Sequence, residues 1–66
     1  MNKPVILKYF AYAHLPARLQ EISRPFGELA ELVVAQTESS TEQSACLRKL
    51  LEAKDAAVRA LLSSDS

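Results

Sequence analysis

Ser44–Leu62, SACLRKLLEAKDAAVRALL, is the stretch that decides the fold, because its pattern is that of one amphipathic helix. Successive residues of an α-helix lie about 100° apart, and this spacing gathers the aliphatic and alanine side chains on one half of the circumference. Arg48 and Glu52 lie on the opposite half, spaced four residues apart as in a helix ion pair. Asp55 and Arg59 repeat that spacing. The pattern predicts a helix with one buried and one solvated side.

Lys54 interrupts the buried side, because it falls in the middle of the apolar half. A lysine in that position must extend its ammonium past the edge of the helix, face a cavity or an interface, or bind an anion. In the first reading it is structural, with a partner carboxylate available across a contact between chains. In the last it is an anion-binding lysine in a pocket formed where chains meet. The residues themselves leave both readings open.

The length of the chain, 66 residues, allows one domain, 1–66. A chain this short buries only about 60% of the surface that it exposes when unfolded, and it commonly needs a disulfide, a metal or a partner chain. Cys46 is the only cysteine and His14 the only histidine, which excludes an internal disulfide and a zinc cluster. Oligomerisation remains. We expect Cys46 to be a small buried side chain in a reducing compartment.

The charge balance also limits the possible partners. Eight basic and eight acidic residues give a net charge of zero, so the attraction that drives non-specific DNA binding is missing. The apolar run nearest the start, Val5–Leu7, is too short for a signal peptide or a membrane span. We expect a soluble, cytoplasmic protein with neither DNA nor membrane as a partner.

Catalysis is not expected from this composition. The lone histidine, His14, stands beside a proline step, and no serine or aspartate belongs to a recognisable nucleophile motif. The acidic residues are mostly spaced to pair with basic ones along helix faces, which is not how catalytic carboxylates are arranged. The chain is therefore predicted to be a binding protein that needs no cofactor.

Residues 1–14 are predicted to form an N-terminal arm, extended or with a single helical turn. The arm carries Tyr9, Phe10 and Tyr12, three of the four aromatic residues in the chain. Prolines bound it, and each proline disfavours helix for the residue before it. An arm this short has no core of its own. Its rings must therefore lie on the helices, on a neighbouring chain or on a ligand.

A first helix is predicted over residues 15–37. Its apolar residues alternate at spacings of four and three, which is typical of a helix packed along one seam, and they are Leu15, Leu19, Ile22, Phe26, Leu29 and Val33. Pro25 lacks the N–H that would bond the carbonyl four residues earlier, and Gly27 weakens the same turn. We expect a bend near Pro25.

A second helix is predicted over residues 41–62, after the polar turn QTESST. Both Ser39 with Glu42 and Ser40 with Gln43 have the spacing of a capping box, so the helix should begin next to one of these serines. Two helices joined by a short turn predict an all-α antiparallel two-helix hairpin. Its apolar surface exceeds what one hairpin covers, so we expect assembly into a homo-oligomer or docking on another protein.

The aromatic and basic residues suit a small anionic ligand, since rings stack on bases and basic side chains contact phosphates. The basic residues of interest on this ground are Arg18, Arg48, Lys54 and Arg59. Arg24 lies on the outer face of the first helix, whereas Arg18 lies at the margin of its seam and is better placed to reach a groove near the arm.

The run YFAYAHLPARLQEISRPFGELAELV, followed after the polar turn by ACLRKLLEAKDAAVRALL, resembles small bacteriophage proteins with a Y-F/HLP start, an S-x-P-F step and an LLEAKDAAVRA ending. The resemblance covers Tyr9 to Leu62. Those proteins are similar to the helical-hairpin domain of phage anti-CBASS and anti-Thoeris sponge proteins. A sponge of that family is a multimer that sequesters cyclic nucleotide second messengers of bacterial immunity without cleaving them.

The resemblance implies roles for particular residues and a ligand. Tyr9 or Tyr12 would stack on a base, and Arg18 or Arg24 would meet a phosphate. A further site between subunits would be lined by Arg48, Lys54 and Arg59. The implied ligand is a cyclic di- or oligonucleotide or a cyclic ADP-ribose type molecule, bound in the cytoplasm of the infected host. The alternative prediction is an oligomeric helical interaction module that docks on a host or phage protein.

Overall fold

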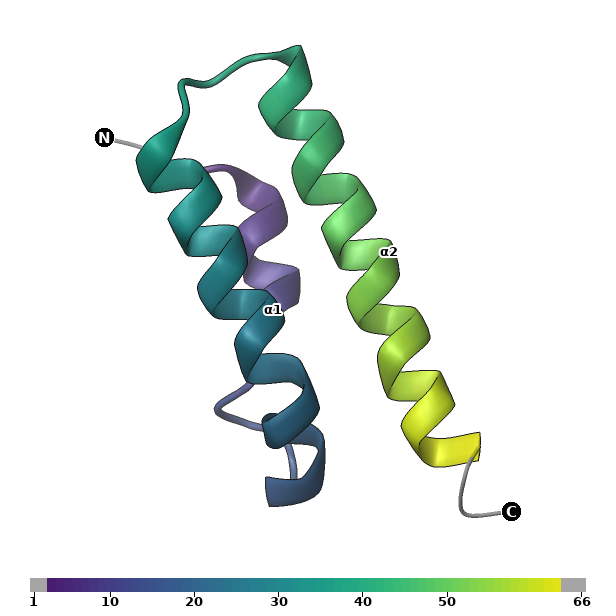
Figure 1. Ribbon diagram of the computed structural model, residues 1–66. Coiled ribbons are helices and arrows are strands. Elements are labelled where there is room, and N and C mark those ends of the chain that lie inside the picture. Colours follow the sequence, from purple (N-terminus) through teal and green to yellow (C-terminus); the bar gives the residue numbers. More distant parts are fainter. Residues whose placement is uncertain (1–2, 64–66) are drawn as a thin grey trace.

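The computed structural model describes residues 3–63 and is built of helices (Figure 1). Residues 1–2, which open the predicted arm, and residues 64–66 lie outside the described residues. The elements are a 3-10 helix η1 (Val5–Phe10) and the α-helices α1 (Ala17–Gln36) and α2 (Thr41–Ser63). No strand occurs in the described part of the chain, so the predicted all-α class is confirmed.

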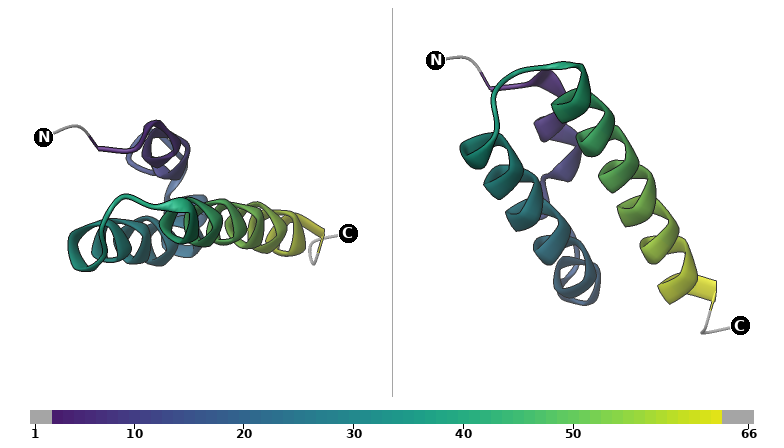
Figure 2. Two further views of the ribbon diagram at one scale, coloured as in Figure 1. Left: turned by 90° about the horizontal axis from the view of Figure 1, so that it is seen from above. Right: turned by 45° about the horizontal axis from the view of Figure 1, so that its top comes forward.

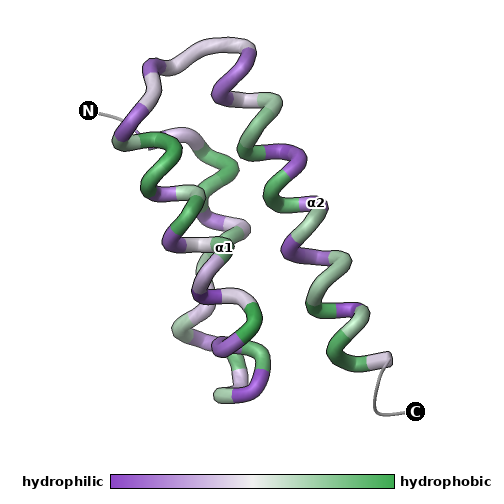
Figure 3. The backbone as a smooth tube through the Cα atoms, viewed as in Figure 1, coloured by the Kyte–Doolittle hydropathy of each residue, from purple (hydrophilic) through white to green (hydrophobic). Residues whose placement is uncertain are grey.

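The two long helices, α1 and α2, lie side by side and are joined at one end by residues 37–40 (Figure 1). The short helix η1 packs against both of them, on one side of the layer that they form (Figure 2). Along each long helix hydrophobic and hydrophilic residues alternate from turn to turn, as expected for helices with one apolar side (Figure 3). The opposite side of the layer has no covering helix within residues 3–63.

Ser40 is the serine that caps α2. Its Oγ accepts a hydrogen bond of 3.1 Å from the backbone N–H of Gln43, as an N-cap residue does. The side chain of Gln43 does not complete the predicted capping box. Its Nε2 donates instead to the carbonyl and the hydroxyl of Thr37, at 3.2 and 3.0 Å. Gln43 is buried, so its amide ties the start of α2 to the end of α1.

The first long helix begins after Pro16, two residues later than predicted, and its last residue is Gln36. Pro16 has the extended backbone of a residue that precedes a helix, and the N–H groups of Leu19 and Gln20 both donate to its carbonyl at 2.9 Å. Pro25 lies inside α1 without ending it. The bend expected near Pro25 stays a prediction.

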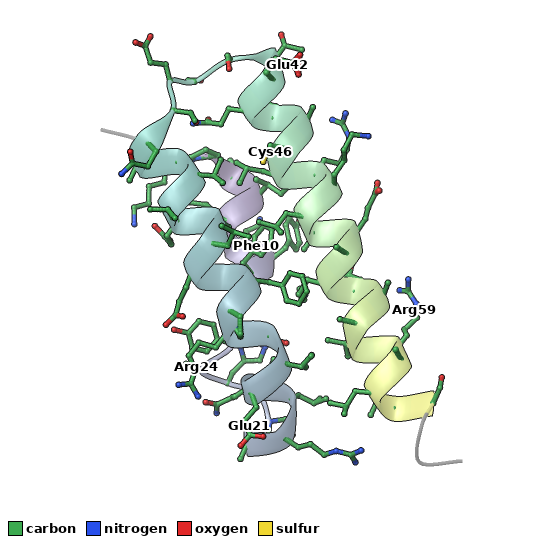
Figure 4. The ribbon with its side chains drawn as sticks, in the orientation of Figure 1. Phe10, Glu21, Arg24, Glu42, Cys46 and Arg59 are labelled. Atoms are coloured by element: carbon green, nitrogen blue, oxygen red, sulfur yellow. The ribbon has the colours of Figure 1, made fainter. Side chains whose placement is uncertain are left out.

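The N-terminal arm is more ordered than predicted. Val5–Phe10 forms a 3-10 helix of six residues, which at three residues per turn is two turns rather than a single turn or an extended strand. Phe10 is buried at its end and lies between α1 and α2 (Figure 4). Lys3 forms an ion pair of 3.0 Å with Glu31 of α1, so the arm is also held at its start. The arm therefore packs on its own helices, which was one of the three predicted possibilities.

The core lies near the joined end of the two long helices. Its buried apolar residues are Phe10, Ala30 and Leu47, one from each helix. Partly buried apolar residues pack around them, namely Ile6, Leu7, Phe26, Val33, Val34, Leu50 and Leu51. This is a small core, which agrees with the limits set by the length of the chain.

The buried face of α1 differs from the predicted seam. Its fully buried residues are the small ones Ser23, Gly27 and Ala30, whereas the large seam residues are half-buried and Leu29 is exposed. The N-terminal segment packs closely against one of these small residues, Gly27. A Cβ atom on Gly27 would lie 3.1 Å from the carbonyl oxygen of Phe10, so only glycine allows this approach without a shift. Gly27 is thus a packing position as well as a weak point in the helix.

The exposure of the single cysteine differs from the prediction. Cys46 was expected to be buried, but it is exposed, because the core contact of this turn is made by the next residue, Leu47. Within residues 3–63 no helix is long and apolar enough to cross a membrane.

Candidate anion-binding pocket

A pocket of about 240 Å³ lies between the first half of α1 and the second half of α2, away from the core. We call it the Lys54 pocket. Its lining residues are Leu15, Leu19, Ser23, Lys54, Asp55, Val58 and Arg59. Aliphatic side chains provide its walls, and its polar groups are one hydroxyl, two basic groups and one carboxylate. Lys54, the residue that interrupts the apolar side of the second helix, therefore lines a pocket.

Lys54 is largely covered, with only 15% of its side chain exposed. Its ammonium lies 3.0 Å from the carboxylate of Asp55, whose side chain is 49% exposed. Adjacent residues on a helix point about 100° apart, so the lysine stem must bend towards the edge of the helix to make this contact. Lys54 thus bends towards the edge of its helix, and within this chain its partner carboxylate comes from the adjacent residue, Asp55.

Asp55 uses a different partner from the one predicted by spacing. The pattern predicted a pair with Arg59, four residues later, whereas the carboxylate contacts Lys54. Arg59 is exposed, and in Figure 4 its guanidinium points away from α1. Arg59 therefore contributes to the pocket as a lining side chain, with its charged group at the solvent side.

Ser23 is the unexpected member of the pocket. It is only 1% exposed, and its Oγ has no hydrogen-bond partner among residues 3–63. A serine inside a helix ordinarily bonds the carbonyl four residues earlier or reaches solvent. Ser23 does neither. It combines this unused hydroxyl with a position in the wall of the Lys54 pocket.

Arg18 lies near the same end of the molecule. Its Nη2 donates a hydrogen bond of 3.5 Å to the carbonyl of Leu61, which links the start of α1 to the end of α2. Arg18 does not line the Lys54 pocket. This contact spans the two helices, and the predicted reach of Arg18 towards a groove near the N-terminal arm stays a prediction.

Two of the predicted arginines lie outside the pocket. Arg24 follows Ser23 directly but is exposed, at the edge of α1 away from α2 (Figure 4). Arg48 is exposed on α2, in the half of that helix nearer the core. Within one chain, Lys54 and Arg59 are thus the predicted basic residues that share a pocket, and Arg24 and Arg48 do not join them.

The two tyrosines occupy different environments. Tyr9 is 56% exposed, with the Lys8 ammonium 5.2 Å from the centre of its ring. Tyr12 is half-buried and lies against the Gly27 position, where its Cδ1 and Cε1 would be 3.2 Å from a Cβ atom. Tyr9 can therefore offer a ring to a ligand, whereas Tyr12 is already used in packing.

A second pocket, of about 280 Å³, lies beside η1 and is lined by Leu7, Phe10, Ala11, Tyr12, Gly27 and Glu31. Among the described residues, Glu31 is its single charged lining residue, and it already pairs with Lys3. An acidic lining disfavours an anion. Of the two pockets, the Lys54 pocket is the one suited to a phosphate.

Metal binding finds no support in the arrangement of the side chains. Among residues 3–63, no three histidine, cysteine, aspartate or glutamate side chains are grouped closely enough to hold an ion. The donor groups of the Lys54 pocket also suit an anion rather than a cation, because two of them carry positive charge.

Sequence reasoning found Lys54 but missed Ser23. A lysine among aliphatic residues breaks a pattern, whereas a serine is unremarkable in a short polar interval. The available signal was the spacing of small residues at Ser23, Gly27 and Ala30, three to four residues apart on one side of α1. That spacing marks the line along which other elements approach α1 closely.

Comparisons with protein-family models, with curated proteins and with solved structures were made for the whole chain. None of the three gives a match. Its function must be argued from its own residues.

Proposed function

We propose that this chain is a non-catalytic sponge that binds and sequesters a cyclic nucleotide second messenger of bacterial immunity, on behalf of a bacteriophage. The observation that carries the proposal is the position of Lys54, a largely covered lysine in a pocket that combines aliphatic walls with a few polar side chains. A nucleotide offers both phosphate charge and apolar base faces. A pocket with aliphatic walls and a basic group matches that combination.

The size of the pocket supports a multimer. Ligand pockets usually measure about 300 to 1,000 Å³, and the Lys54 pocket holds about 240 Å³. One chain would therefore hold a phosphate and its sugar, and a second chain would complete the site. The finer architecture that we propose is an antiparallel helical hairpin that assembles into a homo-oligomer, which could bring Arg24 and Arg48 of neighbouring chains towards the ligand.

Exposed apolar residues provide surface for such an assembly. Leu29 and Leu32 of α1 and Leu62 of α2 are all exposed, as is Val5 of η1. Assembly that gathers such side chains into one contiguous patch would bury them, and contiguous apolar patches are typical of contact surfaces. In the assembled form Tyr9 would stack on a base, because its ring is exposed whereas that of Tyr12 is packed.

Native mass spectrometry of the purified protein tests the proposal directly. The protein would be measured alone and then with a panel of cyclic di- and trinucleotides and cyclic ADP-ribose isomers. We expect a multimer that gains discrete ligand masses, released unchanged on denaturation. A multimer that gains none of these masses would contradict the sponge function, and cleaved ligand would contradict the absence of catalysis.

Matched variants locate the binding site. Lys54→Gln should remove most of the nucleotide binding, whereas Lys49→Gln, at an exposed lysine of the same helix, should change it little. Both variants remove one positive charge, so a general charge effect would appear equally in the two. Affinity of the unmodified protein should also fall as salt is added, since salt screens contacts between charges.

The second candidate function is that of an oligomeric helical interaction module that docks on a host or phage protein. The exposed apolar residues favour it, since they would suit a protein surface as well as a second copy. Under this alternative Lys54→Glu would alter assembly, and no nucleotide would bind at any concentration. The same mass spectra therefore distinguish the two candidates.

A further inference from the structure

The hydroxyl of Ser23 is a buried polar group that the described part of the fold does not use. It is buried, it has no hydrogen-bond partner among residues 3–63, and its residue lines the Lys54 pocket. Leaving a buried hydroxyl without a partner is unfavourable, so such groups in folded proteins usually have a role or a bound partner. This O–H is not engaged by any other described residue, so rotation about the Cα–Cβ bond of Ser23 would turn it towards an acceptor that enters the pocket.

The two members of the Lys54–Asp55 ion pair differ in their exposure to water. Lys54 is largely covered, whereas about half of the Asp55 side chain is in contact with water. Moving the carboxylate out of the contact therefore requires little desolvation, but leaving the lysine alone would leave a covered charge without a counter-ion. Asp55 is thus the member of the pair that can move into water, so another anion can take its place beside Lys54.

We propose that the Lys54 pocket is a subsite for one phosphate group, and that Asp55 acts as an internal counter-ion that the phosphate displaces. The Lys54 ammonium and the Ser23 hydroxyl donate to the phosphate oxygens. The inference deepens the proposed function and rests on it for the source of the phosphate. In this role Asp55 is an acidic residue that opposes phosphate binding although it lines the binding site itself.

The displaced carboxylate has a defined destination. Arg59 follows Asp55 by four residues on the same helix, the spacing at which helix ion pairs form, and its guanidinium points to solvent in Figure 4. Asp55 therefore exchanges the Lys54 contact for the Arg59 contact when phosphate enters. Lys54 and Asp55 each keep an opposite charge nearby in both states, and the exchange needs only side-chain rotation.

The test uses inorganic pyrophosphate as the probe, titrated by calorimetry against the full-length protein and four variants. Asp55→Asn should tighten binding by about three- to tenfold, because the internal competitor is removed. Ser23→Ala should weaken binding by roughly tenfold, the effect of one hydrogen bond to a charged group. Lys54→Gln should abolish binding. Glu52→Gln is the matched control, since it removes a negative charge from an exposed position of the same helix.

Four outcomes overturn the inference. These are no pyrophosphate binding by the unmodified protein, equal effects of Asp55→Asn and Glu52→Gln, unchanged affinity in Ser23→Ala, and binding retained in Lys54→Gln. Circular dichroism of each variant excludes loss of fold as the cause of a weaker signal. Repeating the series with the cyclic nucleotides separates the two proposals. Nucleotide binding that ignores Ser23 and Asp55 defeats this inference alone, and pyrophosphate binding without any nucleotide binding defeats the sponge function alone.

Discussion

At the scale of single residues, Ser23 opposes the stability of the fold. A buried polar group without a partner costs about 1 to 3 kcal/mol. Ser23→Ala removes that group and should raise the free energy of unfolding by about 1 kcal/mol, measured by denaturation in urea. Ser44→Ala is the control, because this exposed serine of α2 changes helix propensity without removing a buried hydroxyl. A loss of stability in Ser23→Ala would mean that the hydroxyl is satisfied in the folded protein.

Gly27 is the residue that fits η1 onto α1. A single added methyl group would meet the Phe10 carbonyl and the Tyr12 ring at 3.1 and 3.2 Å. Gly27→Val adds two further methyl groups there, and we expect a loss of about 1 to 3 kcal/mol, the usual cost of overpacking. Thermal unfolding measures the loss. Valine has a higher helix propensity than glycine, so a loss in Gly27→Val comes from crowding, and Ala35→Val shows the effect of valine at an exposed position of α1. Equal losses in both variants would contradict the packing role.

At the scale of elements, the start of α2 depends on one of two adjacent serines. The hydroxyl of Ser40 caps the helix, so Ser40→Ala should lower the free energy of unfolding by about 1 kcal/mol. Ser39→Ala should lower the free energy of unfolding much less, although both serines have the sequence spacing of a capping residue. Chemical denaturation of the two variants side by side is the measurement. A larger loss in Ser39→Ala would place the cap one residue earlier.

The elements differ in how far their sequence predicts them. The class and the bounds of α2 follow from local rules, namely the apolar stripe and the cap-forming turn, and both are confirmed within a residue. The helix η1 could not be predicted, because Val5–Phe10 has no helical pattern of its own and takes its form from contact with Gly27 and the core. The buried face of α1 was misplaced for the same reason. Its position depends on where a separate element packs.

The candidate pocket was predictable only in part. Lys54 is conspicuous because its own helix supplies the background against which it is an exception. Ser23 and Leu19 come from the other helix, and their meeting with Lys54 depends on how α1 and α2 cross. No periodicity within either helix carries that information. Helix spacing likewise predicted an ion pair between Asp55 and Arg59, whereas Asp55 contacts Lys54. Spacing along a helix carries no information about a lysine side chain that bends towards its neighbour.

At the scale of the whole molecule, the small core bears on the proposed homo-oligomer. Three fully buried apolar residues contribute little stabilisation, and several large apolar side chains remain exposed. When folded chains associate and unfolded chains do not, association stabilises the folded state by mass action. We therefore expect the midpoint of thermal unfolding to rise with protein concentration over about a hundredfold range, followed by circular dichroism. A constant midpoint would indicate a monomer that is stable by itself.

The placement of the core has a mechanical consequence. The tightly packed residues lie at the joined end of the two long helices, and the Lys54 pocket lies towards their free ends. We therefore expect any tilt of α2 to turn about the packed residues near Leu47. Val58 lies about 16 Å along α2 from Leu47, so a rotation of about 5° would move the pocket wall by about 1.4 Å. Substitutions near Leu47 should therefore change the width of the Lys54 pocket without touching its lining residues.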